Sequence, residues 1–138
     1  MKLKRAAVTI VLFIGIPIAF YSCSDSSNPV SKIDDIVFPE KNISYYRTIQ
    51  PLFNIACTSS GCHDVDSKAG NLDLTDYSGI KQRFYDVVIP RDTSLSRLIW
   101  NLEGRPGSSP MPPTRPLTLN QLRGFKQWIM EGATDTIP

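Results

Sequence analysis

One histidine directly follows a pair of cysteines in this chain of 138 residues, and no other stretch constrains the fold as much. Residues 57–63 are Cys-Thr-Ser-Ser-Gly-Cys-His, and they contain two of the three cysteines. The residues between the cysteines are small, and Gly61 can adopt a positive φ where the chain must turn back to present Cys62. The pattern predicts a loop that places two thiols and an imidazole side by side.

These are the three groups that attach a c-type haem to a protein. The thiols of Cys57 and Cys62 would form thioether bonds with the porphyrin vinyl groups, and the imidazole of His63 would bind the iron from one face. Two residues usually separate the cysteines, so the four residues here make a rarer relative of the motif.

Two other interpretations of the stretch stay open. Cys57 and Cys62 could form a disulfide across a small loop, with His63 as a bystander. A structural zinc ion is less favoured, because it needs four protein ligands and the chain offers no second histidine and no cysteine beyond Cys23.

Met111 stands alone among prolines in a loop rich in proline and glycine, residues 104–116. Prolines reduce the conformational entropy that the unfolded loop loses on folding, so they help to hold a thioether at a fixed place. Together with the cysteine and histidine stretch, this position predicts that Met111 binds the iron opposite His63. Met130 is the rival ligand, but it lies on a predicted helix where packing explains it.

The apolar spacing predicts about four short helices. The first runs from about Gln50 to Cys57, with Pro51 in its first turn or with an earlier turn kinked against it. The second is capped by Thr75 or Asp76 and extends to about Phe84. The third is capped within residues 92–94, and its stripe comprises Leu95, Leu98, Ile99 and Leu102.

The fourth helix is the most clearly marked. Thr118 and Gln121 form a capping box, and Gly132 is placed to end the helix. Its apolar stripe comprises Leu119, Leu122, Phe125 and Ile129, with Trp128 beside it. We expect this helix to cross and pack on the helix before Cys57. Between the helices, residues 70–74 form an extended piece with Leu72 and Leu74 on one side.

The N-terminal segment predicts export. Residues 1–22 carry Lys2, Lys4 and Arg5 ahead of an apolar run that is short for a membrane span. Residues 20–23, Phe-Tyr-Ser-Cys, resemble a bacterial lipoprotein box, so Cys23 would be diacylated and anchor the chain to a membrane. Plain secretion with a leftover thiol is the alternative. Residues 23–43 are predicted to form the lipidated tether, with an ordered strap starting near residues 34–38, and residues 44–134 the domain.

The composition fits one globular domain without a nucleic-acid partner. Lys and Arg number 15 against 13 Asp and Glu, with three of the basic residues in the export signal, and there is no basic stripe. After removal of the signal, the chain has the length of one ordinary domain.

Five segments in order resemble the cytochrome c domain of bacterial lipoproteins, in the short form of Bacteroidetes and planctomycete sequences. They are residues 49–53 (IQPLF), 70–74 (GNLDL), 89–95 (IPRDTSL), 110–113 (PMPP) and the helix from 119 to 133 with Gln-Trp-Ile at 127–129. The resemblance implies an all-α, small cytochrome c-like fold with about four short helices and long irregular loops around one haem. It also implies one covalent haem c on Cys57 and Cys62, with His63 as the proximal ligand and Met111 as the distal ligand.

A six-coordinate iron with His and Met ligands has no open position for oxygen, so the chain is expected to be an electron carrier and not an enzyme. Phe53, Leu98 and Trp100 are expected in the apolar wall of the haem pocket. The expected partners are a redox protein and, through Cys23, the outer membrane on its periplasmic or surface face, with the inner membrane as the alternative. The protein is expected to be a monomer. A haem-free interaction module with a disulfide, and a small haem peroxidase, are the rival functions.

Overall fold

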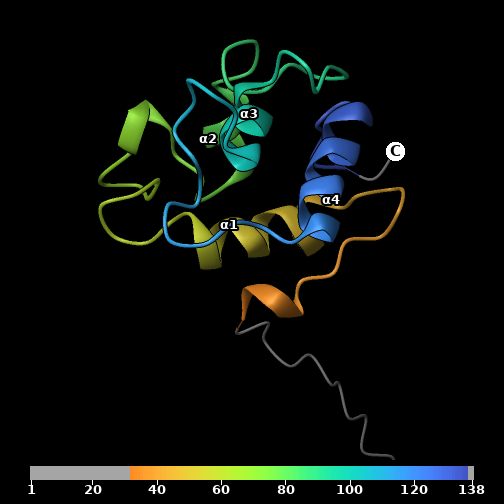
Figure 1. Cartoon of the computed structure of the whole chain (residues 1–138), viewed down its shortest axis with the longest axis horizontal. Helices are drawn as coiled ribbons and strands as arrows, with labels where there is room; N and C mark the ends of the chain where they lie inside the picture. Colours follow the sequence, from red (N-terminus) through yellow and green to blue (C-terminus); the bar gives the residue numbers. More distant parts are fainter. Residues whose placement is uncertain (1–31, 137–138) are drawn as a thin grey trace, which may run out of the picture.

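The computed structural model describes residues 32–136, in which four short α-helices are joined by long irregular segments (Figure 1). The helices are α1 (Gln50–Ala56), α2 (Tyr77–Lys81), α3 (Arg97–Glu103) and α4 (Leu119–Met130). Three single turns, η1 (Ile33–Asp35), η2 (Tyr45–Ile49) and η3 (Ala69–Asn71), complete the regular structure. Within residues 32–136, β-pairing is limited to two isolated bridges. The predicted all-α, small cytochrome c-like architecture is confirmed.

Helix α1 brings the chain to the first cysteine. It begins at Gln50 with Pro51 in its first turn, as predicted, because the missing N–H of a proline costs nothing there. The wider turn η2 precedes it, and the side chain of Ser44 caps that turn. The helix ends where the N–H of Cys57 donates to the carbonyl of Phe53 at 2.8 Å.

Helix α4 has the predicted capping box. Thr118 accepts from the N–H of Gln121, and the side chain of Gln121 accepts in return from the N–H of Thr118. Phe125 is fully buried, and its ring centroid lies 5.4 Å from that of Phe53 on α1. Figure 1 shows α1 lying across the lower end of α4, so the expected packing of these two helices is confirmed. Leu119 was wrongly assigned to the apolar stripe, since it is 87% exposed in the first turn.

Helices α2 and α3 are shorter than the sequence predicts. Asp76 caps α2, which ends at Lys81 before the expected Phe84. Helix α3 begins only at Arg97, because Oδ1 of Asp92 accepts from the N–H groups of Ser94 and Leu95 and folds those residues into a turn. Leu95 consequently points to solvent.

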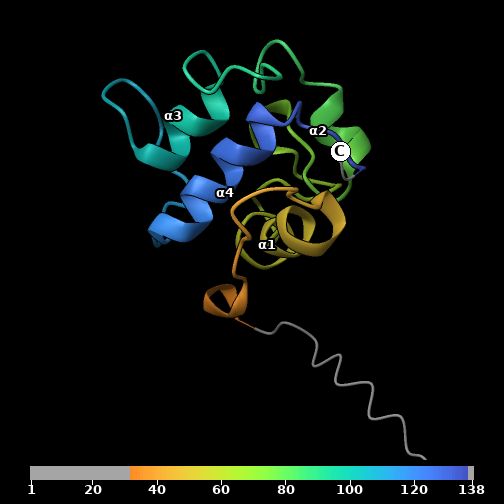
Figure 2. The same ribbon diagram turned by 90° about the vertical axis from the view of Figure 1, so that its right-hand side faces the viewer.

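The core lies between α1, α3 and α4 and also takes in the chain before α1. Ile36, Phe38 and Ile43 are buried, which agrees with the ordered strap expected to start near residues 34–38. The orange segment in Figure 2 follows this path from η1 over the end of α1. Phe38 packs on α4 at Gly124, where a side chain would collide with its ring.

The N-terminal predictions concern another part of the chain. The export signal and Cys23 lie outside the described residues. Among the helices of residues 32–136, none has the length and apolar character needed to cross a membrane.

Candidate functional site

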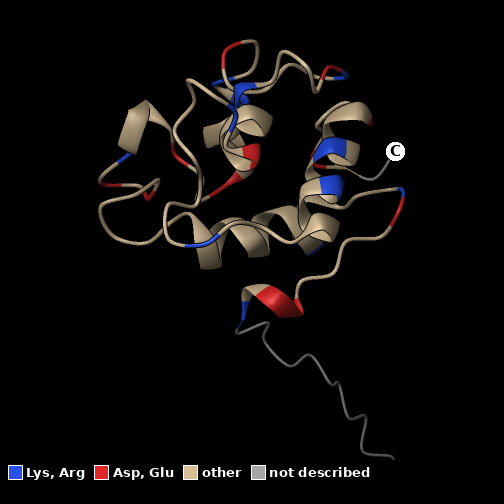
Figure 3. Ribbon diagram, in the orientation of Figure 1, with Lys and Arg blue, Asp and Glu red and all other residues tan. Residues whose placement is uncertain are grey.

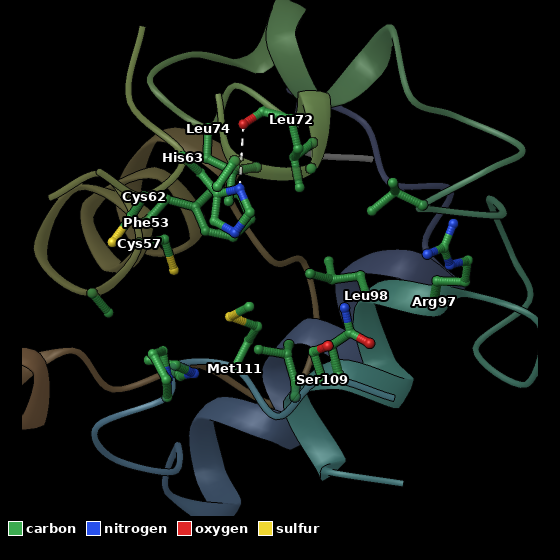
Figure 4. A pocket seen from close by; sticks show the side chains of 18 of the residues that line it. Phe53, Cys57, Cys62, His63, Leu72, Leu74, Arg97, Leu98, Ser109 and Met111 are labelled. Carbon is green, nitrogen blue, oxygen red and sulfur yellow. Dashed lines mark hydrogen bonds between the residues drawn. The ribbon is translucent and has the colours of Figure 1, made fainter. Parts of the chain in front are cut away.

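A pocket of about 480 Å³ opens between the C-terminal end of α1, residues 61–74, α3 and residues 109–113 (Figure 4). This volume is in the range of pockets that hold small molecules and cofactors. Its apolar wall includes Phe53, Leu72, Leu74, Val87, Leu98 and Leu102. Cys57, Cys62, His63 and Met111 all line it as well. The structure therefore brings together all four residues that the sequence predicts around one haem.

The chain between the two cysteines folds outward as a compact loop. The N–H of Cys62 donates to the carbonyl of Ser59 at 2.9 Å, and Gly61 has a φ of +84°. The N–H of His63 donates to the carbonyl of Cys57 at 3.0 Å and closes the loop. Ser59, Ser60 and Gly61 are exposed, whereas both cysteines are half-buried at the pocket. The two additional residues of the spacing are thus accommodated on the surface, and the predicted positive φ of Gly61 is confirmed.

Asp64 holds this loop from outside the pocket. Its carboxylate accepts from the N–H groups of Gly61 at 3.1 Å, Asp66 at 2.9 Å and Ser67 at 2.8 Å. Hydrogen bonds to the ionised form, led by that from Ser67, lower the pKa of Asp64 to about 2. At neutral pH the ionised carboxylate therefore fixes the turn that presents Cys62 and His63.

The His63 ring is oriented by the backbone of the following segment. Its Nδ1 lies 3.3 Å from the carbonyl oxygen of Leu72, and the N–H of Leu74 donates to the carbonyl of His63 at 2.9 Å. A carbonyl oxygen only accepts, so this contact is a hydrogen bond in the tautomer that carries the proton on Nδ1 and leaves Nε2 without one. The extended piece around Leu72 and Leu74 thus orients the ring and leaves Nε2 as the nitrogen that could bind a metal.

Met111 lies across the pocket from His63, as Figure 4 shows. Its N–H donates to the carbonyl of Asn101 on α3 at 2.9 Å. The same loop is tied to α3 by the hydroxyl of Ser108, which donates to the carbonyl of Trp100 at 3.0 Å. The rival Met130 is half exposed on α4 and does not line the pocket. The position of Met111 is therefore fixed by backbone hydrogen bonds and suits a ligand.

Both cysteines on the pocket wall are free thiols in the structure. Burial, followed by the proximity of Cys62, raises the pKa of Cys57 to about 12. The thiolate needed for metal binding or disulfide exchange is therefore scarce at Cys57 near neutral pH. Over the described part of the chain, no three His, Cys, Asp or Glu side chains gather where they could hold a metal ion.

One residue expected in the pocket wall lies elsewhere, and two arginines that line the pocket were not expected there. Trp100 is on the far side of α3, where its Nε1 donates to the carbonyl of Ser94 at 2.6 Å and Arg105 stacks on its ring. Arg83 and Arg97 line the pocket without having been predicted. Helix α3 begins at Arg97, directly after Ser96. Because the sequence predicts an earlier start for this helix, it does not reveal that Arg97 lies on the pocket wall.

Residues 60–115 match the family model of Planctomycete cytochrome C. The matched segment contains Cys62, His63 and Met111 and begins three residues after Cys57. No curated protein and no solved structure gives a significant match. The family match, on a pocket with these side chains, supports a cytochrome c-type domain.

Proposed function

We propose that this protein is a membrane-tethered mono-haem c-type cytochrome that transfers single electrons. The observation that carries the proposal is the convergence of two free thiols, one imidazole and one thioether on a single, largely apolar pocket. These donors fit a covalently attached haem and match the family of the 60–115 segment.

Each residue has one role in this proposal. Cys57 and Cys62 would hold the macrocycle through thioether bonds, His63 would bind the iron through Nε2, and Met111 would be its second ligand. When bound, haem c supplies a metal that cycles between two oxidation states. The chain keeps water from the metal with the apolar wall around Phe53 and Leu98, and it raises the potential by offering sulfur as the second ligand.

The tether is proposed from the sequence. Cys23 would carry the lipid and residues 23–43 would link it to the domain, with the outer membrane as the expected site. Part of that segment is packed in the structure, since Ile36, Phe38 and Ile43 are buried.

Haem retention tests the central proposal. The full chain is expressed in a bacterium with haem-attachment machinery, purified, denatured and stained for haem. We expect a red protein whose haem stays with the denatured chain, and the double variant Cys57→Ala/Cys62→Ala should lose the stain. A colourless wild type with Cys57 and Cys62 joined to each other would instead support the disulfide-containing interaction module.

The axial ligands are tested by spectroscopy of single variants. His63→Ala should abolish the low-spin haem spectrum or make it high-spin. Met111→Ala should keep the haem, lower the reduction potential and allow cyanide or carbon monoxide to bind rapidly. Met130→Ala is the matched control and should leave the spectrum unchanged. Rapid cyanide or carbon monoxide binding by the wild type would favour the peroxidase instead.

Lipidation is tested separately. Growth with a labelled fatty acid should label the wild type and not Cys23→Ala, and the variant should move from the membrane fraction to the soluble fraction. Equal membrane attachment of both proteins would contradict the anchor without affecting the haem site.

A further inference from the structure

Two arginines line the pocket at a distance from the cysteines. Arg83 follows α2, and Arg97 begins α3. Figure 4 shows Arg97 at the opposite end of the pocket from Cys57 and Cys62. The pocket therefore has a sulfur-bearing end and a cationic end.

One carboxylate holds both guanidinium groups. Oδ2 of Asp86 accepts from Nε of Arg83 at 3.2 Å and also from its Nη2, while Oδ1 accepts from Nη1 of Arg97 at 3.0 Å. Figure 3 shows this proximity of red and blue near the start of α3. Hydrogen bonds from Arg83, and next from Arg97, hold the pKa of Asp86 below its ordinary value, so this carboxylate is ionised at neutral pH.

The two arginines are held to different degrees. Nη1 of Arg83 also donates to the carbonyl of Gly70 at 3.0 Å and to that of Asn71, and its side chain is 21% exposed. The Arg97 side chain is 60% exposed. Arg83 is thus fixed in the wall, whereas Arg97 keeps room to meet a ligand.

Two positive charges share one negative charge here, which leaves one positive charge in excess on the pocket wall. Exposed ion pairs add little to stability. The stabilisation gained from these ion pairs therefore does not by itself explain why two arginines lie together on the pocket wall. A guanidinium offers paired donors that match a carboxylate. The cationic end is therefore suited to an acidic ligand edge.

A porphyrin attached through its vinyl side turns its two propionate groups to the other side. We infer that Arg97, positioned by Asp86 and backed by Arg83, binds the acidic edge of the porphyrin and sets its orientation in the pocket. This inference rests on the proposed function. Asp86 is a positioning residue, since it acts through the two arginines.

Resonance Raman spectroscopy of the full-length holoprotein tests the contact, because the propionate bending band moves when hydrogen bonds to the propionates change. Arg97→Gln should shift this band and lower the reduction potential, since one positive charge near the haem is lost. Arg97→Lys should shift the band but keep most of the potential, because it retains the charge without the paired donors. Arg105→Gln is the matched control, as Arg105 is also ion-paired to an acidic residue of α3 but does not line the pocket. It should leave the band in place.

Asp86→Asn gives a second measurement if Arg97 variants fold poorly. It should move the propionate band and raise the potential, and its effect should be non-additive with that of Arg97→Gln. An unmoved band in Arg97→Gln and Asp86→Asn, or an equal shift in Arg105→Gln, would overturn the inference while covalent haem still supports the proposed function. A wild type without covalent haem would overturn both.

Discussion

Gln121 joins two distant parts of the chain through one buried amide. Its Oε1 accepts from the N–H of Thr118 within the capping box. Its Nε2 donates to the carbonyls of Ile33 at 2.6 Å and Ile36 at 3.2 Å, so the same side chain fastens the N-terminal strap to α4. Only 1% of Gln121 is exposed, and these carbonyls would be poorly hydrated without it.

Gln121→Glu should therefore destabilise the protein more than the loss of an ordinary cap. The variant keeps the cap acceptor but turns an oxygen toward two carbonyl oxygens, at a cost of about 1–3 kcal/mol in the free energy of unfolding. Thr118→Ala, which removes the cap alone, should cost about 1 kcal/mol. Guanidinium denaturation followed by circular dichroism measures both. A Gln121→Glu variant as stable as the wild type would mean that the bonds to the strap contribute nothing.

At the scale of the elements, α4 depends on a residue that usually weakens helices. A Cβ on Gly124 would lie 2.6 Å from the Cβ of Phe38 and closer still to its ring. The strap can therefore cross α4 only where the helix lacks a side chain. The same close approach lets Phe38 pack against Phe125, with ring centroids 5.7 Å apart.

Gly124→Ala should destabilise the protein although alanine favours helices by about 1 kcal/mol over glycine. Overpacking against Phe38 should cost about 1–3 kcal/mol, so the net change in unfolding free energy is a loss. In a Phe38→Gly background the substitution should become neutral or stabilising, because both the ring and the Cβ of Phe38 are gone. Arg123→Ala, at an exposed position of the same helix, should stay within about 0.5 kcal/mol. A gain in stability for Gly124→Ala in the wild-type background would refute this account.

The helices show where local signals were sufficient and where they were not. The start of α1 and the capping box of α4 were predictable because Pro51, Thr118 and Gln121 act on their own backbone neighbourhood. The start of α3 was not, because Asp92 caps a turn as readily as a helix, and the hydroxyl of Ser96, bound to the carbonyl of Asp92 at 2.6 Å, stabilises the turn. Trp100 was misplaced as a consequence, since the helix start and the tertiary contacts decide which face meets the pocket.

For the whole molecule, the site combines segments that are distant in sequence. Residue chemistry was enough to predict that Cys57, Cys62, His63 and Met111 lie around one pocket, since cysteine, histidine and methionine are rare in this chain. It was not enough for Arg83 and Arg97, because arginines are common and only folding brings these two to the same pocket. The carbonyl of Leu72 beside His63 was equally hidden, as a backbone group has no sequence signature.

Acid should weaken the folded state through several carboxylates together. Hydrogen bonds or nearby cations lower the pKa of Asp34, Asp64, Asp73, Asp76, Asp86, Asp92 and Glu103. A lowered pKa in the folded state means that the unfolded chain binds more protons as the pH falls. The stabilisation by these carboxylates is therefore fully present above their unfolded pKa of about 4, and it is lost as the pH falls through their folded pKa. We expect a denaturation midpoint that is steady from about pH 5 to 7 and declines below about pH 4.

Asp64 gives this expectation a residue-level test. Its pKa of about 2 in the folded state places its contribution to the decline between about pH 4 and 2. Asp64→Asn should therefore start from a lower midpoint at pH 6 and lose less stability over that interval than the wild type. Asp66→Asn is the charge-matched control, because Asp66 enters this loop through its backbone N–H, and it should follow the wild-type curve. Parallel midpoint curves for Asp64→Asn and the wild type would show that the Asp64 carboxylate does not hold the loop. Convergence of the two curves toward pH 2 would instead show that this one ionised group stabilises the turn that presents Cys62 and His63.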